Sequence, residues 1–499
     1  MLPEIIMIQP RTSLTGTFVR MLPLGLLYAS SKIVKKGLPV HILDTRVSHS
    51  WKEDLKRLIN DNTLIVGLSV MSGVSILESI KISRYVKSNH PNIKIVWGGP
   101  HPTFSPGDVL QEKSVDFVIS GYGVEPFFRL VCNLSGIRDG MELLNIEGLS
   151  WREQEKVMIN QPSHDFEFIH YEDIPYNLIN NLSDYKHIDT EERVFPIYSV
   201  MGCPYKCTFC SSPAQYREIK NKWQVYSIVE VVAHIKMVKE KYKATFIYFI
   251  DDDSFVNLKH VENIIDEINR LNIKIKLGFR GARINEVVKM SNDFLEKLAA
   301  AGTNTMHIGV ESGSDRILSL VKKNTTVKQI LEVNRKLAQH KSIKVFYNFI
   351  VGFPTETMEE TKMTRDLILR LVEENPSCFV IPLNKPRPLP GTELYSSAIN
   401  YGYKAPKSLE EWGEYDVESS NYNSAWLSDA HNRFIRMMFL CMYFIDNKII
   451  RISEGNSFRF RLLKILSLLY KPIAMLRFKR GLYQFLVEDK VYSLLKSIR

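Results

Sequence analysis

The sequence has few of the features that mark secreted or membrane-spanning proteins. Only six cysteines occur in 499 residues, and Cys132, Cys378 and Cys441 each stand alone. A disulfide framework is therefore not expected, and a reducing compartment is favoured. No run of about eighteen uncharged apolar residues is present to span a bilayer, and Met1–Pro10 lacks the regions of a signal peptide. These absences predict a cytoplasmic protein, and the length of 499 residues suggests two to four domains.

The chain also has little net positive charge outside the C-terminus. The net charge is +10, but residues 448–499 hold 12 Lys/Arg and 3 Asp/Glu, which leaves about +1 for the rest of the chain. Such a balance argues against a general nucleic-acid-binding surface. No nucleic-acid partner is therefore expected.

The C-terminal region, residues 401–499, is predicted to be helical and basic. Arg461, Lys464 and Lys471 fall near one helical face among leucines and isoleucines, and Pro472 interrupts the pattern. Such a segment can lie in a membrane interface, which would favour a lipid-like substrate. It can also cap the preceding domain, the more common use of an amphipathic helix. The sequence leaves both alternatives open.

The three other cysteines are close together. Cys203, Cys207 and Cys210 have C-x3-C-x2-C spacing directly after the strand-like run 196–200. Three thiolates on one loop can hold three irons of a four-iron cluster and leave the fourth iron open. A structural zinc site usually takes four ligands, and no fourth Cys or His lies close by in the chain. A [4Fe-4S] cluster is favoured over zinc or free thiols.

Residues 1–135 alternate between strand-like and helix-like runs, as in a doubly wound, Rossmann-like parallel sheet. The strand-like runs are 5–8, 40–44, 64–68, 93–97 and 117–119, and the helix-like runs are 24–36, 51–60 and 76–88. Small residues follow the later strands, at 69–73, 98–101 and 121–123. Ligands of such sheets bind at those strand ends, although a structural or partner-binding domain remains an alternative.

Residues 136–190 are predicted to form a linker with a short hairpin near 148–159, and residues 191–400 a full or partial (β/α) barrel. The predicted barrel strands are 246–250, 275–279, 305–310, 345–351 and 378–383, and the helices are 227–241, 258–271, 291–300, 327–340 and 358–374. Polar residues follow these strands at 251–254, 280–283 and 311–315. The aspartates at 251–253 could hold a divalent metal, bind an ammonium group or cap a helix.

With these features together, the chain resembles radical S-adenosylmethionine (SAM) enzymes of the subgroup with an N-terminal cobalamin-binding domain. The motifs that carry the resemblance are 23–28, 43–44, 98–102 and 121–125 in the first domain, and the cysteine loop, 250–255, 308–314, 352–357 and 390–395 in the second. One departure is the absence of an H-x-x-G sequence, which removes the histidine ligand below cobalt found in related mutases. Cobalamin is expected to bind without it, and loss of the cofactor is the alternative.

The resemblance implies three cofactors: a [4Fe-4S] cluster on the three cysteines, SAM and cobalamin. The implied SAM residues are Phe209 near the adenine, Asp252 or Asp253 at the ammonium group, Arg283 at the carboxylate, and Glu311 and Ser312 at the ribose. The implied cobalamin residues are Ser69, Ser72, Gly98, Gly99, His101, Gly121, Gly123 and Glu125. No catalytic residue is expected beyond those that hold cofactors.

The implied reaction is methylation of an unactivated carbon in a small-molecule or lipid-like substrate. An external one-electron reductant of the flavodoxin or ferredoxin type is implied too. A cyclisation, rearrangement or oxidation without methyl transfer is an alternative, and so is a non-catalytic sensor or assembly protein. A methylthiotransferase is disfavoured, because the first domain has only Cys132 and cannot hold a second cluster.

Overall fold

The protein is described here by a computed structural model, which divides into two compact units. The described residues are 2, 4–12, 21–137, 141–166, 168–186, 192–414, 423–446 and 458–484. Unit 1 comprises residues 1–186, 215–222 and 405–419, and unit 2 comprises residues 187–214, 223–404 and 420–499.

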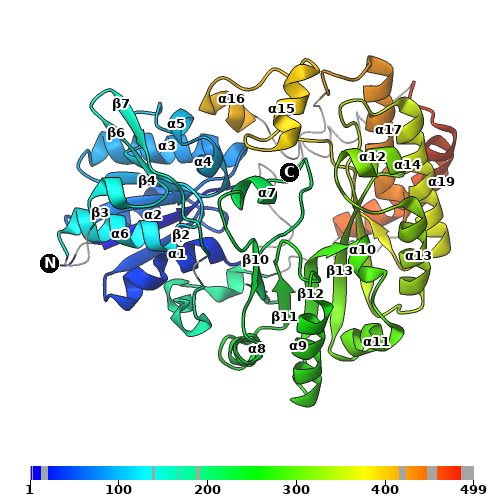
Figure 1. Cartoon of the computed structure of the whole chain (residues 1–499), viewed down its shortest axis with the longest axis horizontal. Coiled ribbons are helices and arrows are strands. Elements are labelled where there is room, and N and C mark those ends of the chain that lie inside the picture. The colour runs from blue at the N-terminus through cyan, green and yellow to red at the C-terminus, as the bar shows by residue number, and fades with distance from the viewer. Residues whose placement is uncertain are drawn as a thin grey trace. The chain divides into compact units, whose positions relative to one another are not determined.

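Unit 1 is built on a seven-stranded sheet with strand order β2-β1-β3-β4-β5-β6-β7 (Figure 1). The strands are β1 (Glu4–Gln9), β2 (Val40–Asp44), β3 (Thr63–Ser69), β4 (Lys94–Gly98), β5 (Phe117–Ile119), β6 (Leu149–Glu153) and β7 (Lys156–Ile159). The first five are parallel, which confirms the predicted Rossmann-like sheet. The hairpin β6–β7, expected within a linker, adds two antiparallel strands beside β5.

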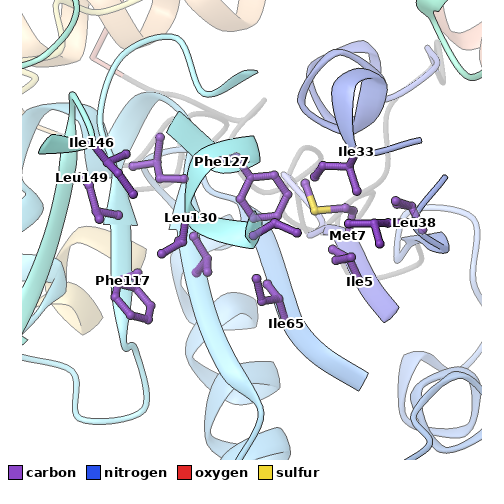
Figure 2. Packing of buried hydrophobic residues seen from close by; sticks show 14 of the residues in the cluster. Ile5, Met7, Ile33, Leu38, Ile65, Phe117, Phe127, Leu130, Ile146 and Leu149 are labelled. Atoms are coloured by element: carbon purple, nitrogen blue, oxygen red, sulfur yellow. The ribbon is translucent and has the colours of Figure 1, made fainter. Parts of the chain in front are cut away.

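Helices cover both faces of this sheet. The helices are α1 (Leu24–Lys35), α2 (Trp51–Leu58), α3 (Val74–Asn89), α4 (Pro100–Phe104), α5 (Pro106–Val109) and α6 (Val124–Ser135). On one face Ile5 and Met7 of β1 pack with Ile33 of α1 and Phe127 of α6, as Figure 2 shows. On the other face Trp97 is fully buried and donates to Ser83 of α3 at 2.9 Å. The sheet is therefore doubly wound.

A short helix from late in the chain, α16 (Leu409–Glu414), packs on α3 of unit 1. Gly73 N donates to Trp412 O at 3.2 Å, and Arg84 forms an ion pair with Glu410 at 3.1 Å. A β-carbon on Gly413 would lie 2.4 Å from Leu77, so only glycine allows this close approach. The sequence had assigned this segment to the C-terminal region.

Unit 2 contains six parallel strands in the order β15-β14-β13-β12-β11-β8, which is a partial barrel. The strands are β8 (Val194–Ile197), β11 (Phe246–Phe249), β12 (Lys276–Arg283), β13 (Thr303–Glu311), β14 (Lys344–Phe349) and β15 (Phe379–Val380). The main helices are α8 (Ile228–Tyr242), α9 (Leu258–Arg270), α11 (Asn292–Ala300), α13 (Val327–Ala338) and α14 (Met358–Glu374). Reciprocal capping boxes at Thr326 and Thr357 begin α13 and α14.

The C-terminal region is helical, as predicted. Helix α17 (Asp429–Ile445) and helix α19 (Phe458–Arg480) pack on each other and on α14. Ala474 and Phe478 of α19 are fully buried in this packing. Among the described residues, no helix is long and apolar enough to span a membrane.

Candidate active site

The cysteine loop follows β9 (Val200–Gly202), a short strand paired with β10 (Trp223–Val225), and leads into α7 (Ser212–Gln215). Cys207 is buried, while Cys203 and Cys210 are half-buried. Two backbone hydrogen bonds connect the loop to other segments of unit 2. Thr208 N donates to Val321 O at 3.2 Å, and Thr208 O accepts from Leu394 N at 2.9 Å. These backbone bonds fix the loop relative to the residue that follows α12 (Asp315–Leu320) and to the first turn of α15 (Glu393–Asn400).

The chemistry of the three cysteine side chains fits ligands of an iron–sulfur cluster. Burial raises the pKa of Cys203 and of Cys210, so an electropositive metal centre is needed to hold them as thiolates. In the part of the chain that the structure describes, no group of three His, Cys, Asp or Glu side chains is arranged around one metal ion. In a four-iron cluster each cysteine binds a different iron, so the three sulfurs need not converge on one point.

The three aspartates after β11 have different environments. Asp251 is fully buried and accepts from Ser199 N at 2.8 Å, Val200 N at 3.1 Å and the Ser254 hydroxyl at 2.8 Å. It thereby holds the backbone that enters β9 and the cysteine loop. Asp252 is partly exposed and lies 3.6 Å from Arg280. Burial and the neighbouring Glu286 raise the pKa of Asp253.

Glu311 and Lys323 form a buried ion pair at 2.7 Å, with about 7% of each side chain exposed. A β-carbon on Gly309 would lie 2.4 Å from the Glu311 carboxylate and 2.5 Å from the Lys323 ammonium group. Glycine at 309 therefore makes room for the pair. Glu311 was predicted at the ribose from its motif, whereas Lys323 was missed because nothing in its local sequence marks it.

Phe209 and Ser312 each have contacts within unit 2. Phe209 packs with the apolar cluster that includes Phe353, and the two rings are 5.8 Å apart. Ser312 is buried, and its hydroxyl accepts from Ser314 N at 3.1 Å. Both side chains therefore have structural contacts in addition to the SAM contacts predicted for them.

In unit 1, the predicted cobalamin residues gather at the carboxyl ends of β3 and β4. Ser69 and Gly98 are paired across these strands. Gly99 has a φ of +100°, and a β-carbon there would lie 2.9 Å from the backbone of Val70. Ser72 is 3.0 Å from His101 Nδ1. The structure thus brings Ser69, Ser72, Gly98, Gly99 and His101 to one edge.

His101 carries the clearest indication that this edge fits a ligand. It is buried, and its Nε2 atom has no hydrogen-bond partner among the described residues. Burial lowers the pKa of His101 to about 4, so the imidazole is neutral at neutral pH. Trp412 of α16 packs edge-on against it, with ring centroids 5.6 Å apart. A buried polar atom usually has a partner, which a polar cofactor would supply.

The glycines after β5 belong to the same edge, but Glu125 has a different role. Gly121 has a φ of +80°, and Gly123 precedes α6. Glu125 accepts from Lys32 of α1 and forms a further ion pair with Arg129. Its carboxylate therefore links α1 to α6, and a cobalamin contact from Glu125 stays a prediction.

Two family models match this chain. One, described as the B12 binding domain, matches residues 18–131, and the other, the Radical SAM superfamily, matches residues 197–368. The chain belongs to the radical SAM enzymes that carry a B12-binding domain. The cofactors of this B12-binding radical SAM enzyme are a [4Fe-4S] cluster, SAM and cobalamin, as the sequence predicted.

Curated relatives of the B12-binding radical SAM enzyme have several activities. An uncharacterized methyltransferase of Pyrococcus horikoshii is 29% identical over 76% of this chain and 78% of its own. An anaerobic magnesium-protoporphyrin IX monomethyl ester cyclase of Synechocystis is 22% identical over 64% of this chain and 62% of its own. A threonylcarbamoyladenosine tRNA methylthiotransferase of Rickettsia prowazekii is 24% identical over 77% and 82%.

Two solved structures share the fold. The cobalamin-dependent SAM radical enzyme OxsB, with aqua-cobalamin and SAM bound, has a TM-score of 0.69 and 17% identity, covering 100% of this chain and 75% of its own. The radical SAM methyltransferase TsrM of Kitasatospora setae, with cobalamin and a [4Fe-4S] cluster bound, has a TM-score of 0.66 and 15% identity, covering 96% and 100%. At these identities the likeness establishes the fold alone.

Proposed function

We propose that this B12-binding radical SAM enzyme methylates an unactivated carbon of a small-molecule or lipid-like substrate. The observation that carries the proposal is the presence, in one chain, of a three-cysteine loop beside a partial barrel and of a B12-binding sheet whose carboxyl edge includes the buried His101 with an unpartnered Nε2 atom. When bound, the cluster and SAM supply a radical that removes a hydrogen atom, and cobalamin supplies the methyl group.

In this proposal the residues of unit 2 hold and orient SAM and the cluster. Cys203, Cys207 and Cys210 ligate three irons. Asp252 is proposed at the SAM ammonium group because it is partly exposed, whereas Asp253 is buried beside Glu286. Phe209 is proposed near the adenine, and Glu311 and Ser312 near the ribose.

In unit 1 the proposed cobalamin residues are those at the carboxyl edge of the sheet. They are Ser69, Ser72, Gly98, Gly99, His101, Gly121 and Gly123. The neutral, buried imidazole of His101 is oriented by Ser72 and offers Nε2 as a hydrogen-bonding atom. Glu125 remains a predicted member of this set, although its carboxylate also pairs with Lys32 and Arg129.

The relative that is a methylthiotransferase does not alter this proposal. Residues 1–186 contain one cysteine, Cys132, which is fully buried in α6. A second cluster in unit 1 would need several cysteine ligands. Cyclisation or rearrangement without methyl transfer is the enzyme alternative, and the cyclase relative gives it specific support.

The first test identifies the products that the reconstituted enzyme forms from SAM. Methyl donation converts SAM to S-adenosylhomocysteine, whereas radical cleavage leaves 5′-deoxyadenosine and methionine. With chemical reductant, SAM and hydroxocobalamin, we expect S-adenosylhomocysteine in an amount stoichiometric with the bound cobalamin, even without substrate. Mass spectrometry of the products, with hydroxocobalamin omitted as the control, measures it.

The two alternatives predict other products in this experiment. Formation of 5′-deoxyadenosine without cobalamin-dependent S-adenosylhomocysteine would contradict methyl transfer and support cyclisation or rearrangement. Neither product, with cluster and cobalamin both bound, would indicate a non-catalytic protein. A flavodoxin- or ferredoxin-type reductant and a cytoplasmic location are part of the same proposal.

Helix α19 supports a second element of the proposal, peripheral contact with an anionic membrane. Away from its buried residues, the side chains of Ile465, Leu469 and Ile473 are 54%, 70% and 52% exposed. The segment Phe458–Gln484 has seven Lys/Arg and no Asp/Glu. Exposed apolar residues at helical spacing, flanked by basic ones, match the chemistry of an anionic lipid interface.

Vesicle sedimentation with the full chain tests this contact. We expect the protein to sediment with phosphatidylglycerol-containing vesicles more than with pure phosphatidylcholine, and Leu469→Glu with Ile473→Glu to abolish the difference. The matched control places the same charges at exposed apolar residues elsewhere, Ile159→Glu with Val229→Glu. Equal sedimentation of the α19 variant and the wild type would refute membrane contact.

A further inference from the structure

Arg283 contacts the cysteine loop directly. It lies at the end of β12, and its Nη1 atom donates to Cys207 Sγ at 3.0 Å. Both residues are buried, with 6% of Arg283 and 7% of Cys207 exposed. The sequence had predicted Arg283 as the partner of the SAM carboxylate. The structure places its guanidinium group on the sulfur of Cys207, a predicted cluster ligand, and the SAM contact stays a prediction.

The rest of the guanidinium group is held by other contacts within unit 2. The Nη2 atom donates to Lys323 O, and Nε donates to Asn285 Oδ1 at 3.4 Å. The central carbon lies 3.8 Å from the centre of the Tyr205 ring. Each of the three nitrogens therefore has a partner in the chain. These contacts hold the guanidinium group in the orientation in which Nη1 donates to Cys207 Sγ.

Tyr205, which lies inside the cysteine loop, is itself held in place. Its hydroxyl donates to Glu286 of α10 (Ile284–Val287), and Glu286 is buried beside Asp253. The stacked ring keeps the cation against the loop, and the glutamate keeps the ring in position. Arg283, Tyr205 and Glu286 thus form one connected support for the Cys207 sulfur.

We propose that Arg283 is a positioning residue that raises the reduction potential of the cluster through its hydrogen bond to Cys207. Reduction adds negative charge to the cluster. A donor to a ligating sulfur, and a positive charge beside it, stabilise the reduced state more than the oxidised state. Because the site is buried, solvent screens this charge only weakly. The inference rests on the cluster of this enzyme family and not on methyl transfer.

The test is a redox titration of the reconstituted full-length enzyme, without SAM, followed by electron paramagnetic resonance. For Arg283→Gln we expect the ratio of reduced to oxidised cluster at a fixed potential to fall about tenfold, a negative shift of about 59 mV for one electron. Arg283→Lys keeps the charge but not the fork of donors, so a smaller shift is expected. The matched control is Arg280→Gln on the same strand, whose arginine is 48% exposed and should leave the potential unchanged.

The outcomes separate the proposal from the predicted SAM contact. A wild-type potential in Arg283→Gln, with weakened SAM binding in equilibrium dialysis, would overturn the proposal and restore the carboxylate role. Iron content is measured first. If Arg283→Gln holds no cluster, the comparison passes to Arg283→Lys, where an unshifted potential would overturn the proposal. Neither readout depends on S-adenosylhomocysteine, so failure of the proposed methyl transfer would not affect it.

Discussion

A variant with alanine at Cys203, Cys207 and Cys210 is expected to bind no iron–sulfur cluster and to keep hydroxocobalamin. The three cysteines supply all the thiolates of the loop, and a cluster cannot be held by backbone atoms alone. The B12-binding residues lie in unit 1, whose sheet and core do not include the loop. Anaerobic reconstitution, desalting, an absorption spectrum and iron and sulfide analysis measure both cofactors.

The matched control removes the other three cysteines instead. Cys132, Cys378 and Cys441 are buried, between 0% and 1% exposed, and their replacement by alanine is expected to leave the iron content unchanged. Buried single cysteines usually act as small apolar residues. Retention of iron by the loop variant, or its loss from the control, would contradict the assignment of the cluster ligands.

Lys323→Met is expected to destabilise unit 2 by about 3–5 kcal/mol, because it leaves the Glu311 carboxylate buried without its partner. The pair is 2.7 Å apart and about 7% exposed on each side, so water replaces little of the lost interaction. The urea midpoint of unfolding, followed by circular dichroism, measures the change.

The neighbouring lysine provides the control. Lys322 pairs with Glu393 at 2.7 Å, but the two side chains are 47% and 59% exposed. Lys322→Met should therefore cost about 0–1 kcal/mol. Adding Glu311→Gln to Lys323→Met removes the stranded charge and is expected to recover part of the loss. Equal losses of stability in Lys322→Met and Lys323→Met would show that the buried pair contributes no more to stability than the exposed pair.

Much of the architecture could be predicted because its signals are local. The apolar run 246–250 became β11 (Phe246–Phe249), and the periodic run 358–374 became α14 with the same bounds. Helical and strand periodicity depend on neighbours within a few residues. The cysteine spacing likewise lies within one loop, and it indicated the cluster before any fold was known.

The contacts that define the candidate site were harder to predict from the sequence. Arg283 and Cys207 are 76 positions apart, and Glu311 and Lys323 are separated by a helix. The motif predicted that Arg283 faces a carboxylate, but not that its nitrogens bind a sulfur and a backbone carbonyl. Tyr205 had one sequence signal, its position inside the cysteine loop. Lys323 had none, since a lysine after a helix is usually exposed.

The sequence by itself determined the order of strands and helices, the doubly wound and barrel-like units, and the three cysteines predicted to hold the cluster. Tertiary structure alone decided that β6 and β7 extend the first sheet, that α16 packs beside His101, and that Arg283 donates to Cys207. The reason is physical. Local patterns fix the backbone of each element, whereas the partner of a buried charge depends on which elements become neighbours when the chain folds.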